Sequence, residues 1–109
     1  LQQREQVLAQ AREEVGRRFA ALRRALSEHL GMDASPPDGS FYYWLPLPEH
    51  AWADPLAFCI RLRDEGRVVL VPGLAFGELG RRHARLSFAA SEEQIAEGVR
   101  RLAPYWQPR

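Results

Sequence analysis

The sequence predicts a small α+β domain with a long N-terminal helix, a mainly antiparallel sheet of about three strands, and helices on one face of that sheet. Apolar residues recur at helical spacing over residues 3–30. Three short strand-like segments follow, with a helical segment between the first two, a loop between the second and third, and a last helical segment after the third. The chain has 109 residues, of which 46% are hydrophobic and 27% are charged. These values describe one small globular domain, residues 1–109.

The first helix is predicted from a regular apolar stripe. Steps of three or four residues keep one face apolar, at Leu8, Ala11, Val15, Phe19, Leu22, Leu26 and Leu30. Gly31 is a natural residue to end the helix. A helix over 3–30 would be about 42 Å long, whereas a 100-residue domain is roughly 26 Å across. We therefore expect its early turns to pack on something outside this chain, the alternative being that the first two turns fray in water.

Three segments are predicted as strands. The aromatic run at 41–47 places one set of side chains on each face: Phe41, Tyr43, Leu45 and Leu47 opposite Tyr42, Trp44 and Pro46. The wholly apolar run at 68–71 predicts a short strand that is buried on both faces and ends before Pro72. Residues 84–89 alternate strictly, with Ala84, Leu86 and Phe88 opposite Arg85, Ser87 and Ala89. An ordered loop is expected at 72–83, which contains three glycines.

Two more helices complete the predicted fold. One begins at Asp54, an N-cap followed by Pro55, and ends at Gly66. The other opens with a capping box at 91–94 and ends at Pro104. Its apolar stripe predicts three inward residues, Ile95, Val99 and Leu102.

The composition excludes some chemistry. All fifteen basic residues are arginine. Without lysine, no side chain can form a Schiff base with an aldehyde cofactor, and no P-loop nucleotide site is possible. The net charge is +1 and fourteen acids are interleaved with the arginines, which argues against a nucleic-acid partner. No apolar run reaches the roughly 20 residues that a membrane helix needs. The lone Cys59 cannot form an internal disulfide, so we expect a reducing, cytoplasmic setting.

Most candidate reactive residues have a plain structural interpretation. Cys59 has no base near it in sequence and is expected as a small buried apolar residue. The three histidines are far apart and lack metal-ligand spacing: His29, His50 and His83. Arg85 differs, because its small neighbours on the strand leave room for a guanidinium that could hold a carboxylate in a bidentate pair. An ion pair within the fold, for example with Glu78, is the alternative that the residues alone favour.

Several segments taken together resemble one family. They are the run Phe41-Tyr-Tyr-Trp-Leu-Pro-Leu-Pro48, the run Glu65-Gly-Arg-Val-Val-Leu-Val-Pro-Gly-Leu-Ala-Phe-Gly77, Gly80, the strand Ala84-Arg-Leu-Ser-Phe-Ala89, and the helix from Ile95 to Leu102. In this order and spacing they resemble the C-terminal small domain of class I/II aminotransferases, the fold-type I enzymes that use pyridoxal phosphate. The resemblance covers nearly the whole chain and is most specific over 66–89.

The resemblance implies particular roles. Arg85 would bind the α-carboxylate of an amino-acid or 2-oxo-acid substrate. Phe76 would lie near the active-site mouth or simply anchor its loop, and Gly39 would lie near the cofactor domain. The resemblance also implies that residues 1–31 form the helix linking a large N-terminal domain to this small one, residues 41–109. That absent domain would supply the Schiff-base lysine, the aspartate at the pyridine nitrogen and the phosphate-binding groups.

The implied function is that of a substrate-binding small domain in an enzyme that exchanges an amino group between an amino acid and a 2-oxo acid. The parent would use pyridoxal phosphate and form a homodimer. The isolated chain would bind no cofactor and be inactive. The chain starts without methionine, which fits a piece of a longer protein. One alternative is the aminotransferase-like effector domain of a winged-helix transcriptional regulator. Another is a free-standing interaction module.

Overall fold

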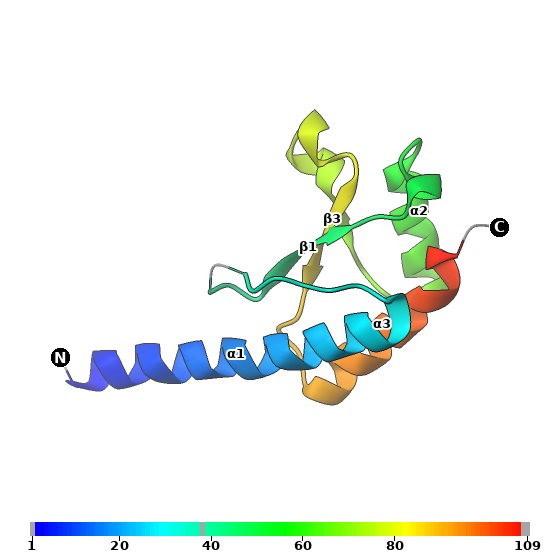
Figure 1. Cartoon of the computed structure of the whole chain (residues 1–109). Coiled ribbons are helices and arrows are strands. Elements are labelled where there is room, and N and C mark those ends of the chain that lie inside the picture. The colour runs from blue at the N-terminus through cyan, green and yellow to red at the C-terminus, as the bar shows by residue number, and fades with distance from the viewer. Residues whose placement is uncertain (1, 38, 108–109) are drawn as a thin grey trace.

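The structure is a computed structural model, and it describes residues 2–37 and 39–107. Its main elements are α1 (Gln2–Leu30), β1 (Tyr42–Pro46), α2 (Pro55–Arg61), β2 (Val71–Pro72), β3 (His83–Ser87) and α3 (Glu92–Trp106). The strands form one antiparallel sheet in the order β1-β3-β2. Helices α1 and α3 pack against each other on one side of this sheet, as Figure 1 shows. The predicted α+β class and three-stranded sheet are confirmed.

The core lies between the sheet and these two helices. Along β3 and just beyond it, Ala84, Leu86 and Phe88 are buried, together with Leu45 of β1. Opposite them, α1 contributes Phe19, Leu22 and Leu26, and α3 contributes Ile95, Val99 and Leu102. The alternation predicted for 41–47 and for 84–89 is therefore confirmed in β1 and β3. It leaves the other face of the sheet, with Tyr42 and Trp44, open to solvent.

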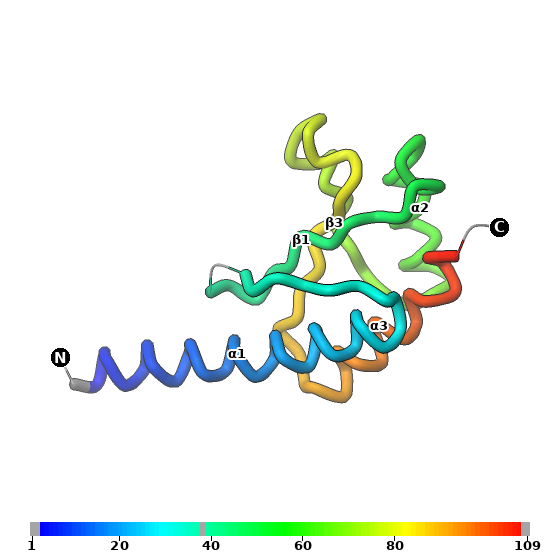
Figure 2. The backbone as a smooth tube through the Cα atoms, viewed as in Figure 1, coloured from blue at the N-terminus to red at the C-terminus, as the bar shows by residue number. Residues whose placement is uncertain are grey.

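Helix α1 extends well beyond the core. Its last turn ends at Gly31, whose φ of +62° is a left-handed conformation that glycine adopts without strain. Residues 3–13 are all exposed, including Leu8 and Ala11 of the predicted apolar stripe. The molecule accordingly measures 53 × 29 × 24 Å, and the early turns of α1 project from it in Figure 2. Within this chain, then, only the second half of the stripe is buried.

The capping predictions are confirmed at both later helices. The Asp54 side chain accepts a hydrogen bond from the backbone N–H of Ala57 at 3.1 Å. Ser91 and Gln94 form a reciprocal capping box, with distances of 3.0 and 3.1 Å. After α2, the chain continues as one wider π-helical turn (Leu62–Gly66) and leaves it at Arg67, which has a φ of 60°.

Two expectations are wrong. The run at 68–71 is not a strand buried on both faces: only Val71 and Pro72 pair with β3, and Val69 is 69% exposed. This run lies at the edge of the sheet, and no described element covers the outer side of Val69. Proline is tolerated in β2 because an edge strand needs no donor on its free side.

The expectation that Pro104 ends the last helix is also wrong, since α3 continues to Trp106. Tertiary contacts hold this extra turn. The Trp106 ring packs on Phe58 with centroids 5.5 Å apart, and the Arg61 guanidinium lies 4.8 Å from the centroid of the Tyr105 ring. These contacts outweigh the single hydrogen bond that proline removes.

The two halves of α1 should differ sharply in what they contribute to stability. Leu22 is 0% exposed and Leu8 is 47% exposed. We expect Leu22→Ala to lower the free energy of unfolding by about 2–5 kcal/mol through the cavity it leaves. Leu8→Ala should change it by about 0.5 kcal/mol or less, since both residues favour helix and no packing is lost. Urea unfolding of the 109-residue chain checks both values. An equal loss in the two variants would mean that the early turns pack within this chain.

Candidate functional site

Arg85 lies at the middle of the central strand, on the open face of the sheet. In the register of the sheet it is opposite Trp44 of β1 and Val71 of β2. Its position follows from the alternation of β3, because its neighbours Ala84 and Leu86 are held in the core. The side chain is therefore directed away from the helices. It is half-buried, whereas most arginines of the four adjacent arginine pairs are exposed; these paired arginines are at 17–18, 23–24, 81–82 and 100–101.

Two aromatic rings pack against the Arg85 guanidinium. Its central carbon lies 4.3 Å from the centroid of the Tyr42 ring and 5.1 Å from that of Phe76. Both distances are within the range of a cation–π contact. Tyr42 comes from β1, and Phe76 from the short 3₁₀ helix η3 (Gly73–Phe76). Rings that pack on the flat face of a guanidinium leave its N–H donors free in the plane of the group.

The expected competitor for Arg85 is paired elsewhere. Glu78 receives a hydrogen bond of 2.7 Å from the Arg81 side chain, and this bond lowers the pKa of the Glu78 carboxyl. The ion pair between Arg85 and Glu78 is therefore not formed. Among residues 2–37 and 39–107, no carboxylate forms an ion pair with Arg85.

The structure adds residues that the sequence did not single out. Tyr42 and Trp44 lie on the same sheet face as Arg85, and both are nearly half exposed, at 48% and 43%. Their alternation along β1 was visible in the sequence. The missing signal was the strand pairing, which sets Tyr42 opposite Ser87 and Trp44 opposite Arg85. We call Tyr42, Trp44, Phe76, His83 and Arg85 the Arg85 cluster.

The remaining candidates are not brought into this cluster, apart from His83. Cys59 is buried in the core at 5% exposure, as predicted. His50 makes a 2.9 Å hydrogen bond with the backbone carbonyl of Tyr105, far along the chain from the other histidines. No group of three metal-ligating side chains occurs in the part of the chain that the structure describes. The paired arginines on the helices mostly bind acids of their own helix, such as Glu14 and Glu97.

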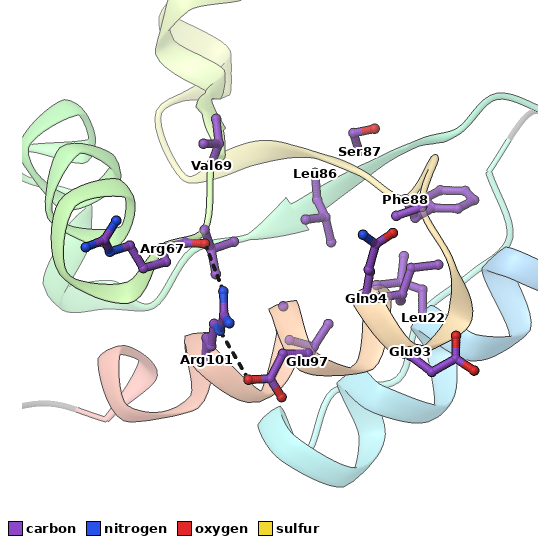
Figure 3. Close-up of a pocket in the computed structure, with 15 residues that line it drawn as sticks. Leu22, Arg67, Val69, Leu86, Ser87, Phe88, Glu93, Gln94, Glu97 and Arg101 are labelled. Carbon is purple, nitrogen blue, oxygen red and sulfur yellow. Dashed lines mark hydrogen bonds and ion pairs between the residues drawn. The ribbon is translucent and has the colours of Figure 1, made fainter.

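A groove of about 500 Å³ lies on the other side of β3 (Figure 3). Its floor is apolar and includes Leu22, Leu86 and Phe88, and its rim includes charged side chains of α3. Arg101 crosses the rim, donating to the carbonyl of Arg67 at 3.5 Å and pairing with Glu97 at 3.2 Å. Arg85 and Phe76 do not line this groove. The groove and the Arg85 cluster are therefore separate features.

Comparison with known proteins identifies the family. A family model described as aminotransferase class I and II matches residues 1–102, so the chain belongs to the class I and II aminotransferases. An LL-diaminopimelate aminotransferase of Dehalococcoides mccartyi (strain BAV1 in its designation) is 36% identical over 77 residues, which are 71% of this chain and 19% of that protein. A probable aspartate/prephenate aminotransferase of Aquifex aeolicus is 40% identical over 81 residues, covering 71% of this chain and 20% of that protein.

Solved structures agree with this assignment. An aromatic aminotransferase from Pyrococcus horikoshii superposes with a TM-score of 0.75 at 28% identity, over 92% of this chain and 26% of that one. The apo structure of BacF from Bacillus subtilis gives a TM-score of 0.72 at 28% identity, over 86% of this chain and 24% of that one. The chain thus spans about a fifth to a quarter of the length of its relatives.

Membership in this family implies pyridoxal phosphate in the full-length proteins. The residues of this chain do not fit that cofactor by themselves. There is no lysine for its covalent attachment. The five residues of the Arg85 cluster supply rings and a guanidinium, and none of them is an acid that could pair with a pyridine nitrogen. Within residues 2–37 and 39–107, no helix has the length and apolar character needed to cross a membrane.

Burial of Cys59 predicts that the free energy of unfolding depends on pH in the alkaline range. Desolvation raises the pKa of its thiol from 9.0 to about 11. The folded state therefore retains a proton that the unfolded chain loses between these values, and stability must fall as the pH rises through this window. Relative to Cys59→Ala, the wild-type chain should lose about 1–2 kcal/mol more unfolding free energy between pH 9 and 11. Denaturant melts at several pH values measure the difference, and parallel pH profiles would contradict it.

Proposed function

We propose that this chain is the substrate-binding small domain of a pyridoxal-phosphate-dependent aminotransferase, in which Arg85 holds the α-carboxylate of the amino-acid or 2-oxo-acid substrate. The observation that supports it most directly is the environment of Arg85. Its guanidinium is half-buried against two rings, and no described carboxylate neutralises it. A substrate-binding domain requires a cation that is held in place and free to pair with the carboxylate of the substrate, and Arg85 has both properties.

The chemistry of the pair favours arginine. A guanidinium has N–H donors in a flat fork that matches the two oxygens of a carboxylate. Tyr42 and Phe76 pack on the flat of this fork without using its donors. A lysine ammonium could supply the charge but neither the second parallel bond nor the stacking surface. Arg85 would in this way fix the orientation of the substrate relative to a cofactor held by the rest of the enzyme.

The rest of the enzyme lies outside this chain in our proposal. The exposed early turns of α1, with Val7 at 62% and Leu8 at 47% exposure, would pack on the large N-terminal domain that supplies the lysine and the cofactor site. The chain alone would therefore be inactive and would bind no cofactor. Family members act on amino and 2-oxo acids and are typically dimers. We extend both properties to the parent protein, in a reducing, cytoplasmic setting that suits the unpaired Cys59.

No nucleic acid or membrane partner is proposed. The arginines that could contact phosphates are largely paired with acids on the protein surface, as with Arg17, Arg81 and Arg100. The regulator alternative has no observation in its favour, and the relatives described above are aminotransferases by name.

The proposal predicts how Arg85→Lys behaves in the full-length enzyme. Loss of the fork should remove about 1.5–3 kcal/mol of carboxylate binding, which corresponds to roughly a 10- to 150-fold increase in KM for the 2-oxo acid. Steady-state kinetics with both substrates measure the change.

Arg24→Lys is the matched control, because Arg24 is an exposed helix arginine outside the Arg85 cluster. Its kinetic constants should equal those of the wild type. Unchanged kcat and KM in Arg85→Lys would assign Arg85 to the support of the fold and remove it from the substrate site.

A further inference from the structure

We propose that Trp44 is the positioning residue of this site: it holds the loop that presents Phe76, and through Phe76 it fixes the direction of the Arg85 guanidinium. This inference rests on the carboxylate-binding role proposed for Arg85. It adds a residue whose ring, within the described residues, forms no cation–π contact with the Arg85 guanidinium, although the sheet register places it opposite Arg85.

Trp44 touches the 73–83 loop at its start, its middle and its return to the sheet. The Trp44 and Phe76 rings meet edge to face, with centroids 6.1 Å apart. The His83 ring stacks on Trp44 at 5.5 Å, with an angle of only 10° between the planes. Gly73, at the start of the loop, lies so close that a Cβ added there would be 2.7 Å from Cη2 of Trp44. One side chain of β1 therefore defines where this loop lies over the sheet.

The neck of the loop is closed by backbone contact. A Cβ on Gly73 would lie 2.2 Å from the carbonyl oxygen of Gly80 and 2.7 Å from that of His83. No side chain fits between the two limbs of the loop. The segment between them, which includes Phe76, is thus closed off by this neck, and the neck lies against the Trp44 ring.

Ring stacking accounts for the position of His83. Its Nδ1 is buried and has no hydrogen-bond partner among the described residues. The imidazole is therefore oriented by its parallel contact with Trp44 rather than by a hydrogen bond. Since His83 is also the first residue of β3, this stack joins the end of the loop to the strand that holds Arg85.

Phe76 connects this arrangement to Arg85. It is 57% exposed, and its aromatic and cation–π contacts are with Trp44 and Arg85, so we expect the direction of its ring to depend on them. A guanidinium confined by Phe76 and Tyr42 enters binding with fewer rotamers to lose. Without Trp44, we expect Phe76 to leave the guanidinium and Arg85 to sample several directions.

The test uses the 109-residue chain and NMR of the Arg85 Nε–H group, with pyruvate as the carboxylate probe. In the absence of pyruvate, Trp44→Ala should move the Arg85 Nε–H resonance toward that of an unconfined arginine, because the ring current of Phe76 is lost. Pyruvate affinity should fall roughly two- to tenfold, the cost of ordering one long side chain on binding. Trp44→Phe, which keeps a ring for the edge contact, should restore most of both properties.

A double-mutant cycle separates positioning from general support of the fold. If Trp44 acts through Phe76, then Phe76→Ala alone reproduces the effect, and adding Trp44→Ala to it changes pyruvate affinity little further. Phe76→Ala removes an exposed ring, so this variant remains informative even where Trp44→Ala folds poorly. Trp106→Ala is the matched control, since it removes an aromatic contact with Phe58, and neither residue belongs to the Arg85 cluster. It should leave the Arg85 resonance unchanged.

The outcomes distinguish the two proposals. Suppose that Arg85→Gln abolishes pyruvate binding, whereas Trp44→Ala leaves both the Arg85 resonance and the pyruvate affinity unchanged. This result would overturn the role of Trp44 and leave that of Arg85 intact. Additive losses in the cycle, or an equal loss in Trp106→Ala, would overturn it as well. Pyruvate binding that survives in Arg85→Gln would overturn the carboxylate site itself, and with it the inference drawn from it.

Discussion

Burial of one face of β3 is the constraint on which the rest of the structure depends. Ala84, Leu86 and Phe88 fill the space between the sheet and the two long helices, and each is at most 8% exposed. Because side chains alternate along a strand, this burial forces Arg85 to the opposite face. The strand is central, so Arg85 also receives a neighbour from each flanking strand. The same interactions that stabilise the core therefore place the guanidinium at the middle of the open face.

Aromatic contacts on that face replace the ion pair that a half-buried arginine usually makes. Along the helices, arginines such as Arg18 and Arg100 bind acids three or four residues away. Arg85 cannot do so, since the nearest residues on its own side of the strand are His83 and Ser87, and neither is an acid. Tyr42 and Phe76 cover its flat surface and leave its donors available. Arg82 makes a similar contact: its guanidinium carbon lies 4.2 Å from the centroid of the Trp52 ring. Rings rather than acids thus accompany Arg82 and Arg85, whereas Arg81 pairs with Glu78.

Periodicity predicted most of the fold, because it reports on interactions within one element. The stripe of α1, the alternation of 84–89 and the capping box at 91–94 are all present. The errors arose where a distant element decides the outcome. Val69 is exposed because nothing described packs outside the edge strand, and α3 passes Pro104 because Phe58 and Arg61 hold its last turn. Phe58 and Arg61 both lie far from Pro104 in the sequence, and the absence of a cover over Val69 is a property of the whole sheet.

The candidate site was predictable only in part, for the same reason. The strand pattern identified Arg85 as an arginine with small neighbours, but it could not decide between Glu78 and an external carboxylate. The structure excludes Glu78 as the partner of Arg85, because Glu78 forms an ion pair with Arg81 of the same loop. Because the chain contains no lysine and fifteen arginines, residue type alone does not distinguish Arg85 from the other fourteen. What distinguishes Arg85 is the strand register that brings Trp44 and Tyr42 beside it. A site of this kind is defined by which side chains have no partner, and that property belongs to the fold as a whole.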